Sequence, residues 1–312
     1  MKIEPLKKYL EEKKIKYLVN HSIKPYVTMA VGGEVQLIAV IYEVSQLKEI
    51  LRHLYTRGFD FLLLGGGSNV IFPDRYSELI VIINRTSDIC KEVEADHLLR
   101  VNSGVFNKNL MDWNIEHHIG GMDFLAGIPG TVGGAAAVNA GAFGQSISTL
   151  LEGAEIVTQK GQIKTVENDY FRFTYRNSVF KYGSEVILNV YLKYFDAESD
   201  EIREKVESNI TYRKENHPGS NLRSAGCFFK NPIIKGKKVS AGKLIEHSGF
   251  KGTSYDTLQV SPMHSNFIIN SGNAGFDDIK RLEAEIAGKV FREKGVKLER
   301  EVIYISPSGK KY

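Results

Sequence analysis

Two glycine-rich segments hold the residues whose types and spacing most directly suggest ligand chemistry. The first, Gly65-Gly66-Gly67-Ser68-Asn69, follows a short apolar run at 61–64. A run of glycines at the end of a strand lets the backbone approach another group closely. Because the apolar residues at 70–72 resume a strand-like pattern, a GxGxxG motif that opens a helix does not fit. We interpret the segment as a tight anion-binding loop with added side-chain hydrogen bonds from Ser68 and Asn69; a plain structural hairpin is the alternative.

The second segment is longer and even poorer in large side chains. It reads Gly127-Ile128-Pro129-Gly130-Thr131-Val132-Gly133-Gly134 and resumes as Asn139-Ala140-Gly141-Ala142-Phe143-Gly144. So many small residues leave a volume that no side chain occupies, which a flat cofactor and its pyrophosphate require. Tight packing of a helix on a sheet explains some of the alanines but not both glycine pairs. Two loops of this kind favour a dinucleotide that lies between two subdomains.

Several single polar residues are also candidates for chemistry. Among them are Arg176, Cys227 and Glu301, to which residue type alone assigns no specific role. On residue type alone each has an ordinary explanation: a surface ion pair for the arginine, a buried structural residue for the cysteine and a solvated strand end for the glutamate. His264 is in the same position, because a lone histidine is most often structural.

The elements that must position these residues do not alternate as regular strand–helix units. Strands are predicted at 35–42, 61–64, 152–158, 162–167, 185–195, 266–270 and 301–306, with a further pair at 79–84 and 98–103. Helices are predicted at 44–57, 107–118, 198–214, 241–248 and 276–294, after an amphipathic helix within residues 1–20. This pattern indicates an α+β protein with mixed sheets and a boundary near residue 200.

Composition excludes several classes of protein. The 312 residues suggest two or three domains. The 41 basic and 37 acidic residues are too evenly balanced to indicate nucleic acid, although a net charge of +4 tolerates a diphosphate ligand. Cys90 and Cys227 are far apart and lack metal-ligand spacing, so we expect no metal site and no disulfide framework. The charged N-terminus and the lack of a long apolar stretch predict a soluble protein without a membrane segment. The two cysteines favour a reducing cytoplasm, and we expect a monomer.

A series of motifs resembles one known family over nearly the whole chain and in the right order. The motifs are Thr28…Gly32-Gly33, LGGGSN at 64–69, AGIPGTVGG at 126–134, NAGAFG at 139–144, YRNSVFK at 175–181, AGCFFKNP at 225–232, AGKLIE at 241–246 and LEREV at 298–302. They are similar to those of the UDP-N-acetylenolpyruvoylglucosamine reductases, also called UDP-N-acetylmuramate dehydrogenases. The short segment after Tyr182 resembles the subgroup that lacks a lid insertion.

The resemblance implies a two-part fold. After the N-terminal helix in 1–20, a vanillyl-alcohol-oxidase-type FAD-binding domain would occupy 21–198, with subdomains at 21–85 and 86–198. A smaller α+β substrate-binding domain would occupy 199–312. FAD would be held without a covalent bond, since Ser68 stands where covalent relatives carry a histidine. The implied FAD contacts are Gly65, Gly66, Gly67, Ser68, Asn69, Gly127, Ile128, Pro129, Gly130, Thr131, Gly133, Gly134, Asn139, Gly141, Ala142 and Gly144.

The resemblance also implies a reaction. NADPH would reduce FAD, and the flavin would pass a hydride from N5 to C3 of UDP-N-acetylglucosamine enolpyruvate while C2 takes a proton, in peptidoglycan precursor synthesis. Arg176 would meet the substrate carboxylate, Glu301 would lie beside the alkene, and Cys227 would replace the usual serine as general acid. The implied substrate contacts are Tyr175, Arg213, Lys230, Asn231 and His264. The alternatives are another FAD oxidoreductase of the same fold and an inactive flavin-binding paralogue.

Overall fold

The computed structural model describes residues 3–92 and 97–312, and contacts divide the chain into two compact units. The first unit comprises Met1–His21, Val35–Gly66 and Glu78–Tyr212. The second unit comprises Ser22–Glu34, Gly67–Ser77 and Arg213–Tyr312.

Two short segments of the predicted FAD-binding domain therefore group with the C-terminal residues. The predicted domain boundaries stay predictions, because grouping by contact does not decide which segments fold together. Residues 1–2 of the predicted N-terminal helix and 93–96 of the predicted second subdomain lie outside the described residues.

The N-terminal helix is shorter than the sequence pattern predicts. Helix α1 spans Glu4–Glu12 and buries Leu6 and Leu10. Lys14 then adopts a left-handed backbone with φ of 55°, which a right-handed helix cannot continue through. The chain enters strand β1 (Tyr17–Ser22) instead, so the prediction of one helix across this region is wrong at its C-terminal end.

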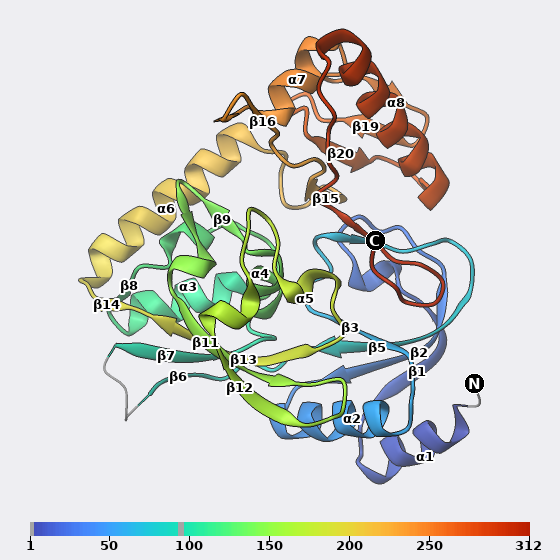
Figure 1. The fold of residues 1–312 in the computed structure, drawn as a ribbon, viewed down its shortest axis with the longest axis vertical. Coiled ribbons are helices and arrows are strands. Elements are labelled where there is room, and N and C mark those ends of the chain that lie inside the picture. Colours follow the sequence, from blue (N-terminus) through green and yellow to red (C-terminus); the bar gives the residue numbers. More distant parts are fainter. Residues whose placement is uncertain (1–2, 93–96) are drawn as a thin grey trace. The chain divides into compact units, whose positions relative to one another are not determined.

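The first sheet of unit 1 is mixed and has the order β1-β2-β5-β3. Its other members are β2 (Glu34–Ile41), β5 (Ser77–Asn84) and β3 (Phe61–Leu64), and β3 runs parallel to β5. Helix α2 (Val44–Thr56) packs beneath the sheets of this unit (Figure 1), with buried leucine and isoleucine side chains recurring at helical spacing. The strands predicted near 35 and 61 and the helix near 44 are confirmed.

The second sheet of unit 1 is antiparallel, in the order β12-β11-β13-β7-β6. Its strands are β12 (Ile163–Glu167), β11 (Leu151–Val157), β13 (Val186–Lys193), β7 (Leu98–Asn102) and β6 (Ile89–Lys91). The strands near 79 and 98 were predicted as a pair, and this is wrong: β5 lies in the first sheet, and β7 pairs with β13 and β6. Strands that follow one another in the sequence usually pair in a sheet, but the residues of β5 and β7 do not themselves specify which strand each one pairs with.

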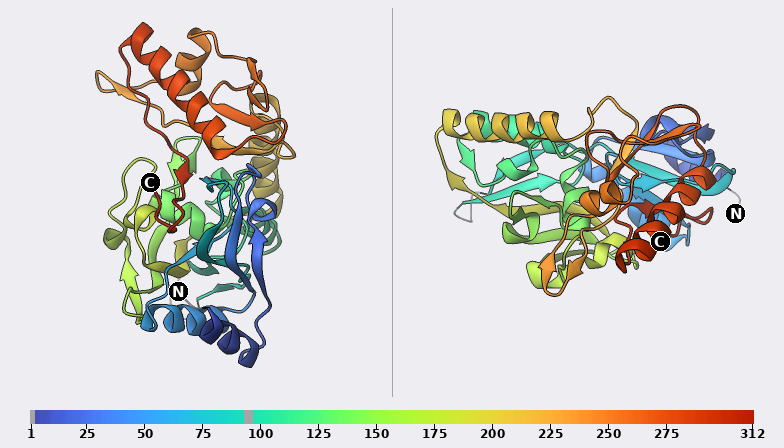
Figure 2. Two further views of the ribbon diagram at one scale, coloured as in Figure 1. Left: turned by 90° about the vertical axis from the view of Figure 1, so that its right-hand side faces the viewer. Right: turned by 90° about the horizontal axis from the view of Figure 1, so that it is seen from above.

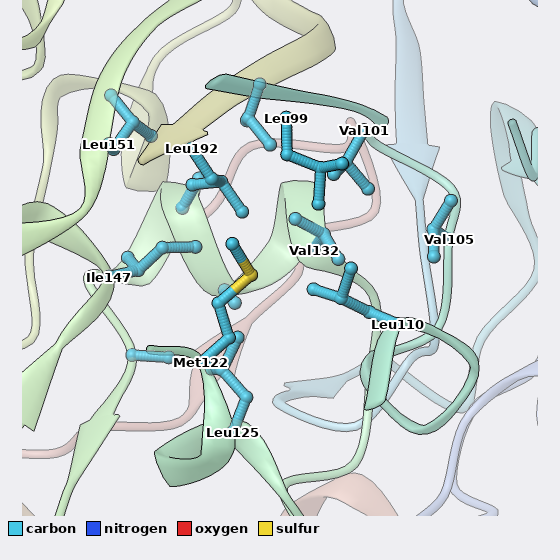
Figure 3. Packing of buried hydrophobic residues seen from close by; sticks show 14 of the residues in the cluster. Leu99, Val101, Val105, Leu110, Met122, Leu125, Val132, Ile147, Leu151 and Leu192 are labelled. Carbon is cyan, nitrogen blue, oxygen red and sulfur yellow. The ribbon is translucent and has the colours of Figure 1, made fainter. Parts of the chain in front are cut away.

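The glycine-rich helix α4 (Val132–Val138) is anchored on this second sheet. Figure 3 shows Val132 pointing into the cluster that includes Leu99, Leu110 and Met122. All four side chains are almost fully buried. The position of the glycine-rich segment is therefore fixed by apolar packing of α4 against the second sheet.

Unit 2 is built around a four-stranded sheet, β15-β20-β19-β18. The strands are β15 (Ser224–Cys227), β20 (Phe267–Asn270), β19 (Leu258–Val260) and β18 (Ser254–Tyr255). Helices α7 (Ala241–His247) and α8 (Phe276–Lys294) pack against each other at the C-terminal end of the chain, in orange and red in Figures 1 and 2.

A separate parallel pairing in unit 2 joins β4 (Val70–Ile71) to β21 (Ile303–Tyr304). The strand predicted from 301 to 306 is thus shorter, and Glu301 precedes it. This pairing confirms that a strand, and not a helix, follows the first glycine loop.

The remaining α-helices and strands complete the description. They are α3 (Asn107–Glu116), α5 (Val179–Tyr182), α6 (Ser199–Asn216), β8 (Ile119–Gly120), β9 (Gly141–Ala142), β10 (Gln145–Ser146), β14 (Phe195–Asp196), β16 (Ile233–Ile234) and β17 (Lys237–Lys238). Among the described residues, no helix is long and apolar enough to cross a membrane, and no cluster of residues could hold a metal ion.

Candidate active site

The two glycine-rich segments meet backbone to backbone in unit 1. A Cβ atom added to Gly65 would lie 2.4 Å from Oγ1 of Thr131, and one added to Gly66 would lie 2.6 Å from Cα of Gly130. Separations this short exclude any side chain. The glycine run predicted a close approach of the backbone to another group. That group is the second glycine-rich segment, so the two segments lie side by side.

Two residues that the sequence analysis missed hold these loops in place. Asn107, at the start of α3, donates its backbone N–H to the Gly130 carbonyl (3.0 Å) and its Nδ2 to the Ile128 carbonyl (3.1 Å). Arg85 donates from Nη1 to the Gly65 carbonyl (2.8 Å). No sequence signal marks either residue, because each acts on a loop that is distant along the chain.

This cradle fits a phosphate-bearing cofactor. Within residues 3–92 and 97–312, the backbone N–H groups of Gly66 and Gly130 donate to no other protein group. Outward-facing amide groups on side-chain-free loops are the donors that a pyrophosphate accepts from. Thr131 caps α4 by accepting from the N–H of Gly134 (3.3 Å), which keeps its own side chain turned into the loop. Gly127, Pro129 and Gly133 lie in the same turn-and-helix segment, as expected.

Arg176 lies at the tip of a tight turn closed by two hydrogen bonds between Thr174 and Asn177. Its φ of 56° is in the left-handed region, and its guanidinium donates to the carbonyls of Asn139 (3.4 Å) and Gly141 (2.6 Å). The predicted carboxylate-binding arginine is thus brought to the predicted cofactor segment. Ala142 and Gly144 belong to the adjoining β9–β10 hairpin.

Tyr175 and a buried lysine flank this arginine. The Tyr175 side chain is partly exposed, with its ring centre 5.5 Å from the guanidinium carbon of Arg176. Lys181, only 1% exposed, donates from Nζ to the Arg176 carbonyl (3.4 Å). The lysine lies within the YRNSVFK motif, yet no separate role was predicted for it. Its hydrogen bond to the Arg176 carbonyl stabilises the turn.

In unit 2, the segment that carries Cys227 pairs with the segment that carries Glu301. The N–H of Glu301 donates to the Phe228 carbonyl (2.8 Å), and the N–H of Lys230 donates to the Glu299 carbonyl (2.8 Å). An isolated antiparallel bridge between Phe229 and Arg300 lies between these two bonds. The backbones that carry the predicted acid and the predicted glutamate are therefore directly connected.

The end of the first glycine loop belongs to the same part of unit 2. The parallel pairing of β4 with β21 matches Val70 with Ile303, and the N–H of Ile303 donates to the Asn69 carbonyl (3.0 Å). Ser68 and Glu301 each precede that register position by two residues. Because the strands are parallel, both residues lie at the same end of the pairing.

Lys230 and Asn231 are both engaged with neighbouring groups. The Lys230 ammonium contacts the Glu299 carboxylate, with side chains 15% and 72% exposed respectively. Oδ1 of Asn231 accepts the N–H of Ala241 (2.8 Å) and so caps the start of α7. Within the described residues the Nδ2 group of Asn231 donates to no protein atom, so this amide is available to a ligand.

His264 lies in an aromatic cluster with His217 and Phe267, with ring centres 5.2 Å away in each case. Burial lowers the pKa of His264 below its usual value. Burial, together with the charges of His264 and Arg213, lowers the pKa of His217 to about 4. The structure thus brings Arg213 and His264, both predicted as substrate contacts, to one cluster.

The tautomer of His264 is fixed by its neighbour. Nδ1 of His264 accepts the backbone N–H of Asn266 (3.2 Å). A ring nitrogen that accepts a hydrogen bond carries no proton, so the neutral ring carries its proton on Nε2. Neutral His264 can therefore act as a hydrogen-bond donor through Nε2.

Comparisons with known proteins match both parts of the chain. Residues 35–167 match an FAD binding domain family, and residues 217–305 match the UDP-N-acetylenolpyruvoylglucosamine reductase C-terminal domain family. These matches confirm the expected fold class, a vanillyl-alcohol-oxidase-type FAD-binding domain with a smaller α+β domain.

Relatives named UDP-N-acetylenolpyruvoylglucosamine reductase match over most of their length. The Chlamydia abortus protein is 31% identical, with 90% of this chain and 91% of the relative covered. The Bacillus pumilus protein is 31% identical, with 96% and 98% covered. The solved reductase structure from Thermus caldophilus is 28% identical, has a TM-score of 0.74 and covers 93% of this chain and 98% of its own.

The matched relatives cover both units, and the glycine cradle fits the cofactor that the matched domain is named for. FAD and NADPH, the expected cofactors, are those of the matched reductases. The chain therefore belongs to the UDP-N-acetylenolpyruvoylglucosamine reductase family, a family of FAD-dependent oxidoreductases that use NADPH.

Proposed function

We propose that this chain reduces UDP-N-acetylglucosamine enolpyruvate to UDP-N-acetylmuramate, with Arg176, Cys227 and Glu301 as its chemical groups. The observation that carries the proposal is the direct backbone pairing of the Cys227–Lys230 and Glu299–Glu301 segments. This pairing presents an acid and a carboxylate on adjoining segments of unit 2. An enolpyruvyl ether requires that arrangement, since one carbon of its double bond must take up a proton.

When bound, FAD would supply the redox chemistry, in which a hydride from NADPH passes to C3 of the substrate. The available backbone N–H groups of Gly66 and Gly130 would donate to its pyrophosphate. Ser68 and Asn69 would add hydrogen bonds at the other end of the first loop.

Arg176 would stabilise the negative charge that develops on the substrate carboxylate as C3 gains a hydride. Its planar fork can offer two parallel hydrogen bonds to a carboxylate, which lysine cannot do. In the structure the same guanidinium donates to two carbonyl groups, which supports its capacity for a bidentate contact. Tyr175 would form part of the wall beside it.

Cys227 would donate the proton to C2, and Glu301 would orient that step. A thiol with a reference pKa of about 8.5 is mostly protonated at neutral pH and is a stronger acid than the usual serine. Asn231, whose Nδ2 is available, would contact the diphosphate of the substrate together with Lys230 and Arg213. His264 would donate a hydrogen bond to the substrate from Nε2. Lys230 would have to exchange its contact with Glu299 for one with the ligand.

The test separates the two half-reactions by anaerobic stopped-flow absorbance of the flavin. NADPH is expected to bleach the flavin of wild type, Cys227→Ala and Cys227→Ser at similar rates. Reoxidation by UDP-N-acetylglucosamine enolpyruvate should persist in the serine variant and be lost in the alanine variant. Reoxidation of Cys227→Ala at the wild-type rate would remove Cys227 as the donor.

A wild-type flavin that NADPH bleaches and this substrate fails to reoxidise would refute the proposed reaction and favour another FAD oxidoreductase. A yellow protein without NADPH turnover would indicate an inactive paralogue.

We also propose that the protein works in the cytoplasm as a monomer. The cytoplasmic location follows the proposed reaction, whose substrates are charged nucleotides. Size-exclusion chromatography with light scattering tests the second point: a mass near the 35.0 kDa of one chain supports it, and a multiple of that mass contradicts it.

A further inference from the structure

Asn266 is a buried asparagine that no part of the reaction described above uses. It is 2% exposed and immediately precedes β20. Its backbone carbonyl accepts the N–H of Phe228 (2.7 Å), and its Oδ1 accepts the N–H of Phe229 (2.9 Å). Its Nδ2 donates to the Phe229 carbonyl (2.8 Å). One asparagine therefore satisfies three backbone groups of the two residues that follow Cys227.

The side chain of Asn266 takes the place of an interrupted strand pairing. The register between β15 and β20 shifts between Ser224 and Cys227, and Gly226 has a φ of 79°. A bulge of this kind leaves the following backbone groups without regular partners. Asn266 supplies those partners with its side-chain amide, which mimics a peptide group in having one acceptor and one donor.

The opposite edge of the same two residues holds Glu301. The Phe228 carbonyl accepts the N–H of Glu301 (2.8 Å), and Phe229 bridges to Arg300. The Phe228-Phe229 backbone is thus held on one side by Asn266 and holds Glu301 on the other. Any shift of this backbone moves Cys227 and Glu301 together.

We propose that Asn266 is a positioning residue for proton delivery, because it fixes the segment that carries Cys227 and that pairs with the segment carrying Glu301. The inference rests on the proposed role of Cys227. It extends to His264, whose Nδ1 accepts the N–H of Asn266. The histidine that would meet the substrate and the segment that bears the acid are thereby coupled through one residue.

Substitution of Asn266 by aspartate separates positioning from general stability. The Asp side chain keeps the shape and the Oδ1 acceptor, but it places a carboxylate oxygen against the Phe229 carbonyl. A buried carbonyl that loses its donor costs about 1–3 kcal/mol, and the repulsion pushes the segment away. Asn270 is the matched control, since it ends β20, is 4% exposed, and makes three side-chain hydrogen bonds, one more than Asn266. Its partners are Met29, Gly272 and Ala274.

The experiment measures both half-reactions of the FAD-loaded enzyme for Asn266→Asp and Asn270→Asp. For Asn266→Asp we expect the NADPH reaction to stay close to wild type, while flavin reoxidation by the enolpyruvyl substrate slows by about tenfold or more, the equivalent of ~1.4 kcal/mol. The substrate KM should change little, and the solvent deuterium isotope effect on reoxidation should rise because proton transfer becomes limiting. Asn270→Asp should lose thermal stability without this selective slowing.

Reoxidation of Asn266→Asp at the wild-type rate would overturn the inference, as would a parallel loss of both half-reactions in both variants. Asn266→Ser shortens the side chain without adding charge, and it decides the matter if the aspartate variant does not fold. Cys227→Ala distinguishes a failure of the proposed proton donor from a failure of the positioning role of Asn266. If Cys227→Ala reoxidises normally, the proposed donor is wrong; if it is slow and the folded Asn266 variants are not, only the positioning role fails.

Discussion

At the scale of single residues, Arg176 shows how local backbone geometry serves chemistry. Its left-handed backbone at the tip of a turn directs the guanidinium toward the carbonyls of Asn139 and Gly141. A non-glycine residue in this region carries a conformational cost, which the surrounding hydrogen bonds must offset. Arg176 is therefore held by the segment that we propose to contact FAD.

Replacing Arg176 with lysine should keep the charge and remove the fork. We expect kcat/KM for the enolpyruvyl substrate to fall by roughly 10–100-fold, the equivalent of about 1.4–2.8 kcal/mol, because one point charge replaces a bidentate contact. Steady-state kinetics measure this change, and the visible absorbance of bound flavin controls for damage to the loop. An unchanged kcat/KM with full flavin content would contradict a role in carboxylate binding.

At the scale of elements, the meeting of two glycine loops is the feature that carries the proposed cofactor site. Gly66 faces the backbone of Gly130 and has no room for a side chain. The loops are in turn held by Asn107 and Arg85, which project from a helix start and a strand end.

Gly66→Ala tests this contact. The added Cβ would lie 2.6 Å from the Gly130 Cα, so the two loops must separate. We expect purified protein with much less bound FAD and a lower melting temperature that added FAD partly restores. The control is Gly288→Ala in α8, where the new Cβ would meet only the flexible end of Arg292 at 3.3 Å. Full FAD content in Gly66→Ala would show that the loops can part without loss of the site.

The sequence predicted the elements better than their pairing. The helices near 44, 198 and 276 follow from apolar spacing or charge pattern, and the structure has them as α2, α6 and α8. The partners of β7 could not be predicted, because register is set by packing between distant segments. Asn266 and Asn107 were missed for the same reason: a buried asparagine acquires its role from the backbone that another segment brings to it.

At the scale of the whole molecule, the half-buried His217 makes stability depend on pH. The pKa of His217 is lowered to about 4 by burial and by the charges of His264 and Arg213. The unfolded chain takes up a proton near the reference value of about 6.5. Between these values the unfolded state binds more protons, so the free energy of unfolding falls as pH falls.

We expect His217→Gln to reduce this dependence. The contribution of His217 to stability is complete above about pH 6.5 and is lost as pH falls toward 4. Urea unfolding of wild type and variant at pH 7.5 and 5 measures it, and the difference between the two proteins removes the contribution of carboxyl groups common to both. Parallel pH profiles for wild type and variant would mean that His217 titrates normally in the folded protein.

The central claim is that electrons from NADPH reach the double bond of UDP-N-acetylglucosamine enolpyruvate through this chain. Its most direct test combines NADPH consumption with mass spectrometry of the nucleotide sugar, in anaerobic buffer with purified FAD-loaded protein. We expect one product molecule, heavier by two hydrogens, for each NADPH oxidised. An unchanged mass of the nucleotide sugar, with NADPH either untouched or oxidised only when oxygen is admitted, would contradict it.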